Sequence, residues 1–125
     1  MLNYDETQKA LDQLLDALPP GIFTNLNCGV ALLEDTIFDA NGLLILGLYH
    51  VEPYGLGRYV TIHHGSMCIA YGHLPPQIFK DKLKEILYHE LTHHVEHLAG
   101  DRSLEIKDAI DMKKMLADLD SYMDL

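Results

Sequence analysis

The strongest constraint on the fold of this chain is a His-Glu-x-x-His pattern at residues 89–93. It lies in a stretch that we expect to be helical from Gln77 to Ala99. Residues four apart on a helix share a face, so His89 and His93 can reach one metal ion. Glu90 is rotated about 100° from His89, which lets it hold a metal-bound water without taking a coordination position. The spacing therefore predicts a site that activates water, with two histidine ligands and Glu90 as general base.

The two faces of this predicted helix support a functional role for the histidines. Pro75-Pro76 suit a first turn and Gly100 suits the C-terminal cap. At 100° per residue, His89, His93 and Glu96 fall roughly opposite the apolar face. That apolar face consists of Leu87, Leu91, Val95 and Leu98. Because the histidines do not interrupt it, we expect them to line a cleft rather than to fill core positions.

Two further histidines of the helix, His94 and His97, are poor candidates for a third metal ligand. A catalytic zinc site usually has three protein ligands and one open position. His94 is rotated 100° from His93, and His97 is about 6 Å further along the helix axis. We therefore expect each to face solvent or to contact a ligand rather than the ion.

A better third ligand lies in a predicted C-terminal helix, from Ser103 to about Tyr122, for which Ser103 is the N-cap. Glu105 and Asp108 fall inside its apolar face, with Leu104, Ala109, Met112, Met115, Leu116, Leu119 and Met123. Burying an unpaired charge is costly, so both carboxylates need partners. We predict that Glu105 binds the metal and that Asp108 orients a ligating imidazole. Two alternatives stay open: both acids cap the helix N-terminus, or Asp101 is the ligand.

The rest of the sequence predicts an α+β fold with a small mixed sheet. Residues Tyr4 to Leu18 form an amphipathic pattern that Pro19-Pro20-Gly21 ends. The predicted strands are Cys28 to Leu33, Leu43 to His50, Arg58 to His64 and, as a fourth short one, Ser66 to Tyr71. The second of these is apolar throughout, which is typical of a strand buried on both faces.

Length and charge limit the possible partners. The 125 residues suit a single domain, and the net charge of -10 disfavours nucleic acid, whose phosphates need clustered Lys or Arg. The longest apolar run, Leu43 to Tyr49, is too short to cross a membrane, and the acidic N-terminus is unlike a signal peptide. We expect a cytoplasmic protein in which Cys28 and Cys68 are reduced and buried.

From about Gly47 to Asp108, the chain resembles the short bacterial zincin-like metallopeptidases. The matching segments are Gly57-Arg58-Tyr59-Val60, Tyr71-Gly72-His73-Leu74-Pro75, His89-Glu90-Leu91-Thr92-His93-His94, Leu98-Ala99-Gly100-Asp101-Arg102 and Leu104-Glu105. The resemblance implies a minimal zincin-like fold, in which a small mixed sheet is packed on helices, together with zinc and peptide-bond hydrolysis. Many members have a glycine three residues after the second histidine, followed by an acidic ligand. Here Glu96 occupies that position and the next glycine is Gly100.

These observations predict a zinc-dependent peptidase whose peptide or protein substrate lies extended along an exposed sheet edge. In this hypothesis His89, His93 and Glu105 hold Zn²⁺, and Glu90 passes a proton from water to the leaving amine. His94, His97 or a strand tyrosine is the candidate for stabilising the oxyanion. One alternative is a regulatory or latent module that keeps the fold and the metal without efficient turnover. A metal-dependent nuclease is a second, against which the acidic charge counts.

Overall fold

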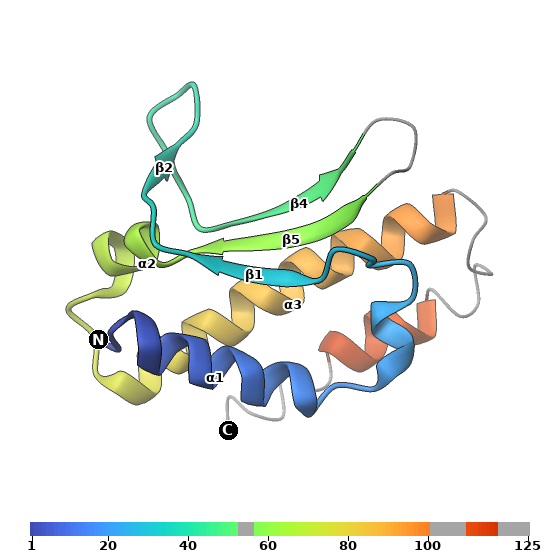
Figure 1. Cartoon of the computed structure of the whole chain (residues 1–125), viewed down its shortest axis with the longest axis horizontal. Coiled ribbons are helices and arrows are strands. Elements are labelled where there is room, and N and C mark those ends of the chain that lie inside the picture. Colours follow the sequence, from blue (N-terminus) through green and yellow to red (C-terminus); the bar gives the residue numbers. More distant parts are fainter. Residues whose placement is uncertain (53–56, 101–109, 118–125) are drawn as a thin grey trace.

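The computed structural model describes residues 1–52, 57–100 and 110–117, and it confirms a mixed α+β architecture. Its elements are α1 (Tyr4–Asp16), the 3-10 helix η1 (Pro20–Phe23), β1 (Val30–Leu33), β2 (Ile37–Phe38), β3 (Leu44–Ile45), β4 (Gly47–Val51), β5 (Arg58–His63), α2 (His64–Tyr71) and α3 (Pro76–Gly100). Residues 110–117 are also helical. Figure 1 shows α1 and α3 together on one side of the sheet, while the β2–β3 hairpin projects away from them.

Helix α1 has the predicted start and the predicted inner face. The Asn3 side chain accepts from the Glu6 backbone N–H at 2.8 Å, and the Glu6 carboxylate accepts from the Asn3 N–H at 3.0 Å. Within α1, Leu11 is buried and Leu14 and Leu15 are half-buried against the core, while Leu18 is buried just beyond the end of the helix. The amphipathic pattern thus correctly predicted how this helix covers the core.

The main sheet has the strand order β1-β5-β4. β5 is parallel to β1 and antiparallel to β4, with Val60 opposite both Val30 and Tyr49. Val60 and Ile62 of β5 are fully buried and contribute to the core. Helix α3 packs on this face, against the central strand β5 and against β4.

The prediction that Leu43 to His50 is a strand buried on both faces was wrong. The run is divided between β3 and β4, and its residues from Leu44 to His50 are only half-buried. β4 pairs with β5 alone among the described strands, so it lies at an edge of the sheet. Apolar residues are retained there because one face of β4 packs on α3.

The predicted fourth strand, Ser66 to Tyr71, was also wrong, since these residues belong to α2. Neighbouring Ser66 and Met67 are both buried and Ile69 is exposed, a distribution that does not follow the alternation of a strand. A short apolar run between glycines does not separate the two periods. The second glycine, Gly72, is instead the C-cap of this helix.

The structure tests the predictions that the two cysteines are reduced and buried and that no segment crosses a membrane. Cys28 and Cys68 are free, as predicted, but Cys28 is exposed and Cys68 is only half-buried, so the expectation that both are buried was wrong. Cys28 comes before β1 begins, where no described helix covers it. Among the described helices, none has the length and apolarity needed to cross a membrane.

Candidate metal centre

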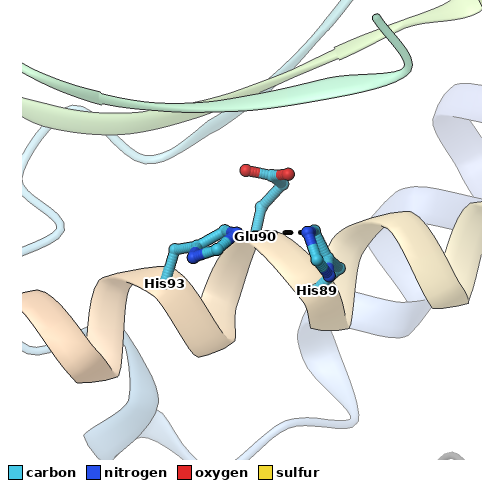
Figure 2. Close-up of side chains that lie close together, drawn as sticks. All are labelled: His89, Glu90 and His93. Carbon is cyan, nitrogen blue, oxygen red and sulfur yellow. Dashed lines mark hydrogen bonds between the residues drawn. The ribbon is translucent and has the colours of Figure 1, made fainter.

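Helix α3 presents one face to the core and the other to solvent, as its periodicity predicts. Leu87, Leu91 and Val95 are fully inaccessible, while His89 and His93 are exposed. The histidine side chains lie on the same side of the helix, one turn apart, as Figure 2 shows. The local sequence therefore placed the pair correctly, because position on a helix fixes direction.

The two imidazoles have a geometry that fits a single divalent ion. Their Nε2 atoms lie 3.1 Å apart. Two nitrogens bound tetrahedrally at about 2.0–2.1 Å from one zinc would be separated by about 3.3 Å. Nitrogen and oxygen atoms of His89, Glu90 and His93 all lie within 4.8 Å of one another. Imidazole with carboxylate is a donor set that suits zinc.

Glu90 lies between the histidine pair and the sheet. Its carboxylate points towards the strands in Figure 2, and the residue is only 7% exposed. Burial raises the pKa of Glu90, while the nearby His93 and His89 oppose that rise. The approach of β4 is close, since a Cβ on Gly47 would lie 3.2 Å from Glu90 Cγ and 2.7 Å from Ile86 Cγ2. Glycine at position 47 thus gives the strand access to this carboxylate.

Two recesses beside β4 share Gly47 and Glu90 in their linings, and they are together called here the β4 groove. One recess, of about 370 Å³, is lined by Leu44, Leu46, Gly47, Glu85, Ile86, His89 and Glu90. The other, of about 590 Å³, is lined by Gly47, Leu48, Tyr49, Val51, Glu90, His93, Glu96 and His97. The groove therefore runs past both histidines and has the candidate base at its middle.

His94 departs from its prediction, because it neither faces solvent nor contacts the histidine pair. It is fully buried, with Nε2 2.7 Å from the Thr24 carbonyl oxygen and Nδ1 2.7 Å from the Tyr49 hydroxyl. A carbonyl only accepts, so Nε2 carries the hydrogen and neutral Nδ1 accepts from Tyr49. Burial lowers the pKa of His94, although the bond to Thr24 opposes this. The flank of α3 that carries His94 is covered by β4 and by the segment after η1.

His97 lies outside the group of possible metal ligands found among the described residues. It is half-buried, and its ring centroid is 5.9 Å from that of Tyr49. It therefore contributes to the wall of the β4 groove, one turn beyond His93.

Glu96 and Lys113 form a contact that the sequence did not predict. Glu96 Oε2 is 3.7 Å from His93 Nδ1, and Lys113 Nζ is 2.8 Å from Glu96 Oε1. The Lys113 hydrogen bond holds the pKa of Glu96 below its usual range. The helical phase had placed Glu96 beside the histidines, but only the fold brings Lys113 to it.

The C-terminal helix is described only at residues 110–117, where it has the predicted inner face. Leu116 is buried and Met112 and Met115 are half-buried, while Asp111 and Lys114 are exposed. A recess beside the metal site is lined by residues of both helices. They are Lys113, Leu116 and Ala117 of this helix and Glu85, Tyr88, His89 and Thr92 of α3. The predicted ligand Glu105, its neighbour Asp108 and the alternative Asp101 lie outside the described residues.

Comparisons with known proteins bear on the fold alone. Neither a protein-family model nor a curated protein matches this chain. A solved structure of a conserved hypothetical protein from Thermus thermophilus is similar, with a TM-score of 0.69 and 25% sequence identity. The likeness covers 79% of this chain and 99% of that one. The architecture is therefore shared with another protein for which no activity is named.

Proposed function

We propose that this protein is a zinc-dependent metallopeptidase with a minimal zincin-like fold. The observation that carries the proposal is the 3.1 Å separation of the His89 and His93 Nε2 atoms, beside the buried carboxylate of Glu90. A pair of imidazoles at this distance suits one zinc ion. A carboxylate next to them, but directed towards a groove, suits a base rather than a structural ligand.

A bound zinc ion supplies Lewis acidity, which polarises a peptide carbonyl and lowers the pKa of water. Glu90 accepts a proton from the attacking water as the oxygen adds to the carbonyl carbon. It then delivers that proton to the amine as the C–N bond breaks. Burial, which raises the pKa of Glu90, favours the first step, because a more basic carboxylate accepts the proton of the attacking water more readily.

The substrate class proposed for this site is a peptide or an extended protein segment. β4 lies at the edge of the main sheet, and the β4 groove runs beside it past Glu90. An extended chain adds to such an edge through main-chain hydrogen bonds, and pockets then receive alternate side chains. The apolar Leu44, Leu46 and Ile86 on one side of Glu90 suit an aliphatic side chain.

For the third protein ligand we propose Glu105, with Asp108 orienting a ligating imidazole. Support comes from residues 110–117, whose Lys113 and Leu116 line a recess together with His89. Glu105→Ala is expected to weaken zinc binding severely, and Asp108→Ala by about ten- to a hundredfold, as losses around a ligand usually do. Asp101→Ala is expected to leave the affinity unchanged. The opposite ranking, with Asp101 essential, would remove Glu105 from the site.

The proposal is tested by metal analysis and by Glu90→Gln. Elemental analysis of protein purified without chelators should find one zinc per chain. If no zinc is bound even after zinc supplementation, the proposed metal site is wrong. Glu90→Gln should retain zinc and fold normally while losing the cleavage of a broad peptide library. If this variant loses the metal as His89→Ala does, Glu90 is a ligand rather than a base. Zinc binding without any cleavage by the unaltered protein would favour a regulatory or latent module.

A further inference from the structure

The metal site continues beyond its ligands into a chain of contacts that crosses to the C-terminal helix. His93 Nδ1 lies 3.7 Å from Glu96 Oε2, and Glu96 Oε1 lies 2.8 Å from Lys113 Nζ. We propose that Glu96 is a positioning residue for His93 and that Lys113 holds Glu96 in place. Residues 110–117 thereby set the affinity of the site for its metal. This inference rests on the proposed function.

The ring of His93 is oriented so that its two nitrogens have separate tasks. Nε2 faces Nε2 of His89, which leaves Nδ1 as the nitrogen away from the ion. A metal at Nε2 requires the proton of the neutral ring to be on Nδ1, where a carboxylate can accept it. Such an acceptor fixes the tautomer and the ring orientation and raises the basicity of the ligating nitrogen. Glu96 is the carboxylate that approaches Nδ1.

Glu96 acts through His93 rather than by binding the ion. Its carboxylate approaches Nδ1, the nitrogen that does not face His89. Among the described residues, the group whose ligand atoms lie within 4.8 Å of one another contains His89, Glu90 and His93 and omits Glu96. Replacing Glu96 should therefore weaken the site without changing the set of coordinating atoms.

Lys113 is needed because Glu96 is exposed and otherwise has freedom to rotate. The side chains of Glu96 and Lys113 are 47% and 43% exposed, so their ion pair contributes little to stability. Its effect is geometric, because a restrained carboxylate spends more time facing Nδ1 than a free one. The attachment of the helix itself comes from buried Leu116. Variants of the ion pair should therefore fold normally, which makes the contact suitable for a test.

The experiment measures the zinc affinity of the full chain by competition with a chromophoric chelator. Glu96→Gln is expected to raise the Kd by about ten- to a hundredfold. Lys113→Met should raise it by a smaller factor, and the double variant should bind no more weakly than Glu96→Gln alone, since Lys113 acts through Glu96. Matched controls are Glu34→Gln and Lys114→Met, which change exposed charges away from this contact.

A second readout separates positioning from ligation and from general destabilisation. In cobalt-substituted protein, the visible absorption reports the coordinating atoms, so Glu96→Gln should leave the spectrum unchanged at saturating cobalt. A changed spectrum would make Glu96 a ligand and overturn the inference. If the unaltered protein binds zinc and Glu96→Gln binds it with the same affinity, this inference is overturned while the proposed function stands. No zinc binding by the unaltered protein would overturn the proposed function and this inference with it.

Discussion

At the scale of single residues, His94 joins three parts of the molecule. Its ring, on α3, binds Tyr49 of β4 through Nδ1 and the Thr24 carbonyl, which follows η1, through Nε2. The bond to Tyr49 leaves the hydroxyl hydrogen directed at His94. In this structure Tyr49 therefore supports the frame around the site, rather than offering that hydrogen to a substrate oxyanion.

Tyr49→Phe should destabilise the protein by about 1–3 kcal/mol, because it leaves His94 Nδ1 buried without its donor. The free energy of unfolding in urea measures the effect. Tyr59→Phe is the matched control: its hydroxyl donates to Glu52 at the surface, and we expect a change within about 0.5 kcal/mol. Equal losses in the two variants would contradict the role given to His94.

The predictability of individual residues depended on how far away their partners lie in the sequence. His89, Glu90 and His93 could be placed because spacing along one helix determines direction. The partners of His94 are 45 and 70 residues away, so no local spacing announces them. The Lys113–Glu96 contact was missed for the same reason, although Glu96 itself had been placed on the histidine side.

At the scale of elements, the approach of β4 to α3 depends on a residue without a side chain. Gly47→Ala would place a Cβ 2.7 Å from Ile86 Cγ2, so either the Ile86 side chain or one of the two elements would have to shift. We expect a loss of about 1–3 kcal/mol in unfolding free energy, as overpacking usually costs. We also expect weaker peptide binding, because the strand beside the β4 groove moves.

Gly21→Ala is the control for Gly47→Ala. A Cβ on Gly21 would meet only Met112 Cε, at an ordinary 3.7 Å, so its stability should change little. Chemical denaturation of both variants, with peptide binding measured on folded protein, checks the prediction. An unaltered stability in Gly47→Ala would mean that β4 adapts without cost.

Elements were predictable where the periodicity of their apolar residues was clear. The 25-residue helix α3 and strand β5 appear nearly at their predicted bounds, because their apolar periodicity is clear. α2 and β4 were misjudged because short apolar runs do not reveal whether they form a strand or a helix, or whether one face or two are covered. Whether one face or both faces of a strand are covered depends on which elements pack on the sheet, and these elements come from distant parts of the chain.

At the scale of the whole molecule, a hydrogen-bonded chain crosses the face of the sheet away from α3. His50 Nε2 is 2.8 Å from Thr61 Oγ1, which is 3.0 Å from His63 Nε2, and His63 Nδ1 is 2.6 Å from Asp35 Oδ1. Asp35 lies between β1 and β2, so these hydrogen bonds tie the segment that leads into the β2–β3 hairpin to the main sheet. Burial, and then the charge of His63, lower the pKa of His50, while Glu52 opposes this.

This shift predicts a loss of stability in acid. The folded-state pKa of His50 lies below the ordinary histidine value of about 6.5, so folding favours the neutral ring. The contribution of His50 to the free energy of unfolding is fully present above about pH 6.5. It decreases as the pH falls towards the folded-state pKa, because the unfolded chain takes up the proton first. His50→Gln should therefore reduce the loss of unfolding free energy between about pH 7.5 and 5.5.

Urea denaturation of zinc-free protein at the two pH values measures this difference. The lowered pKa of His94 acts in the same direction, so His50→Gln should reduce the acid sensitivity without abolishing it. His73→Gln, which changes an exposed histidine, is the comparison variant. An identical acid sensitivity in His50→Gln and the unaltered protein would contradict the role of the hydrogen-bonded chain.

The histidine pair and the neighbouring carboxylate of Glu90 depend on different parts of the fold. His89 and His93 lie within about one turn of α3, so a nascent helix is enough to bring their imidazoles together. The surroundings of Glu90 require β4, which is held in turn by β5 and the long-range pairing with β1. In the proposed enzyme, the two imidazoles can therefore come together before β4 encloses Glu90, so the histidine pair forms earlier in folding than the catalytic base acquires its surroundings.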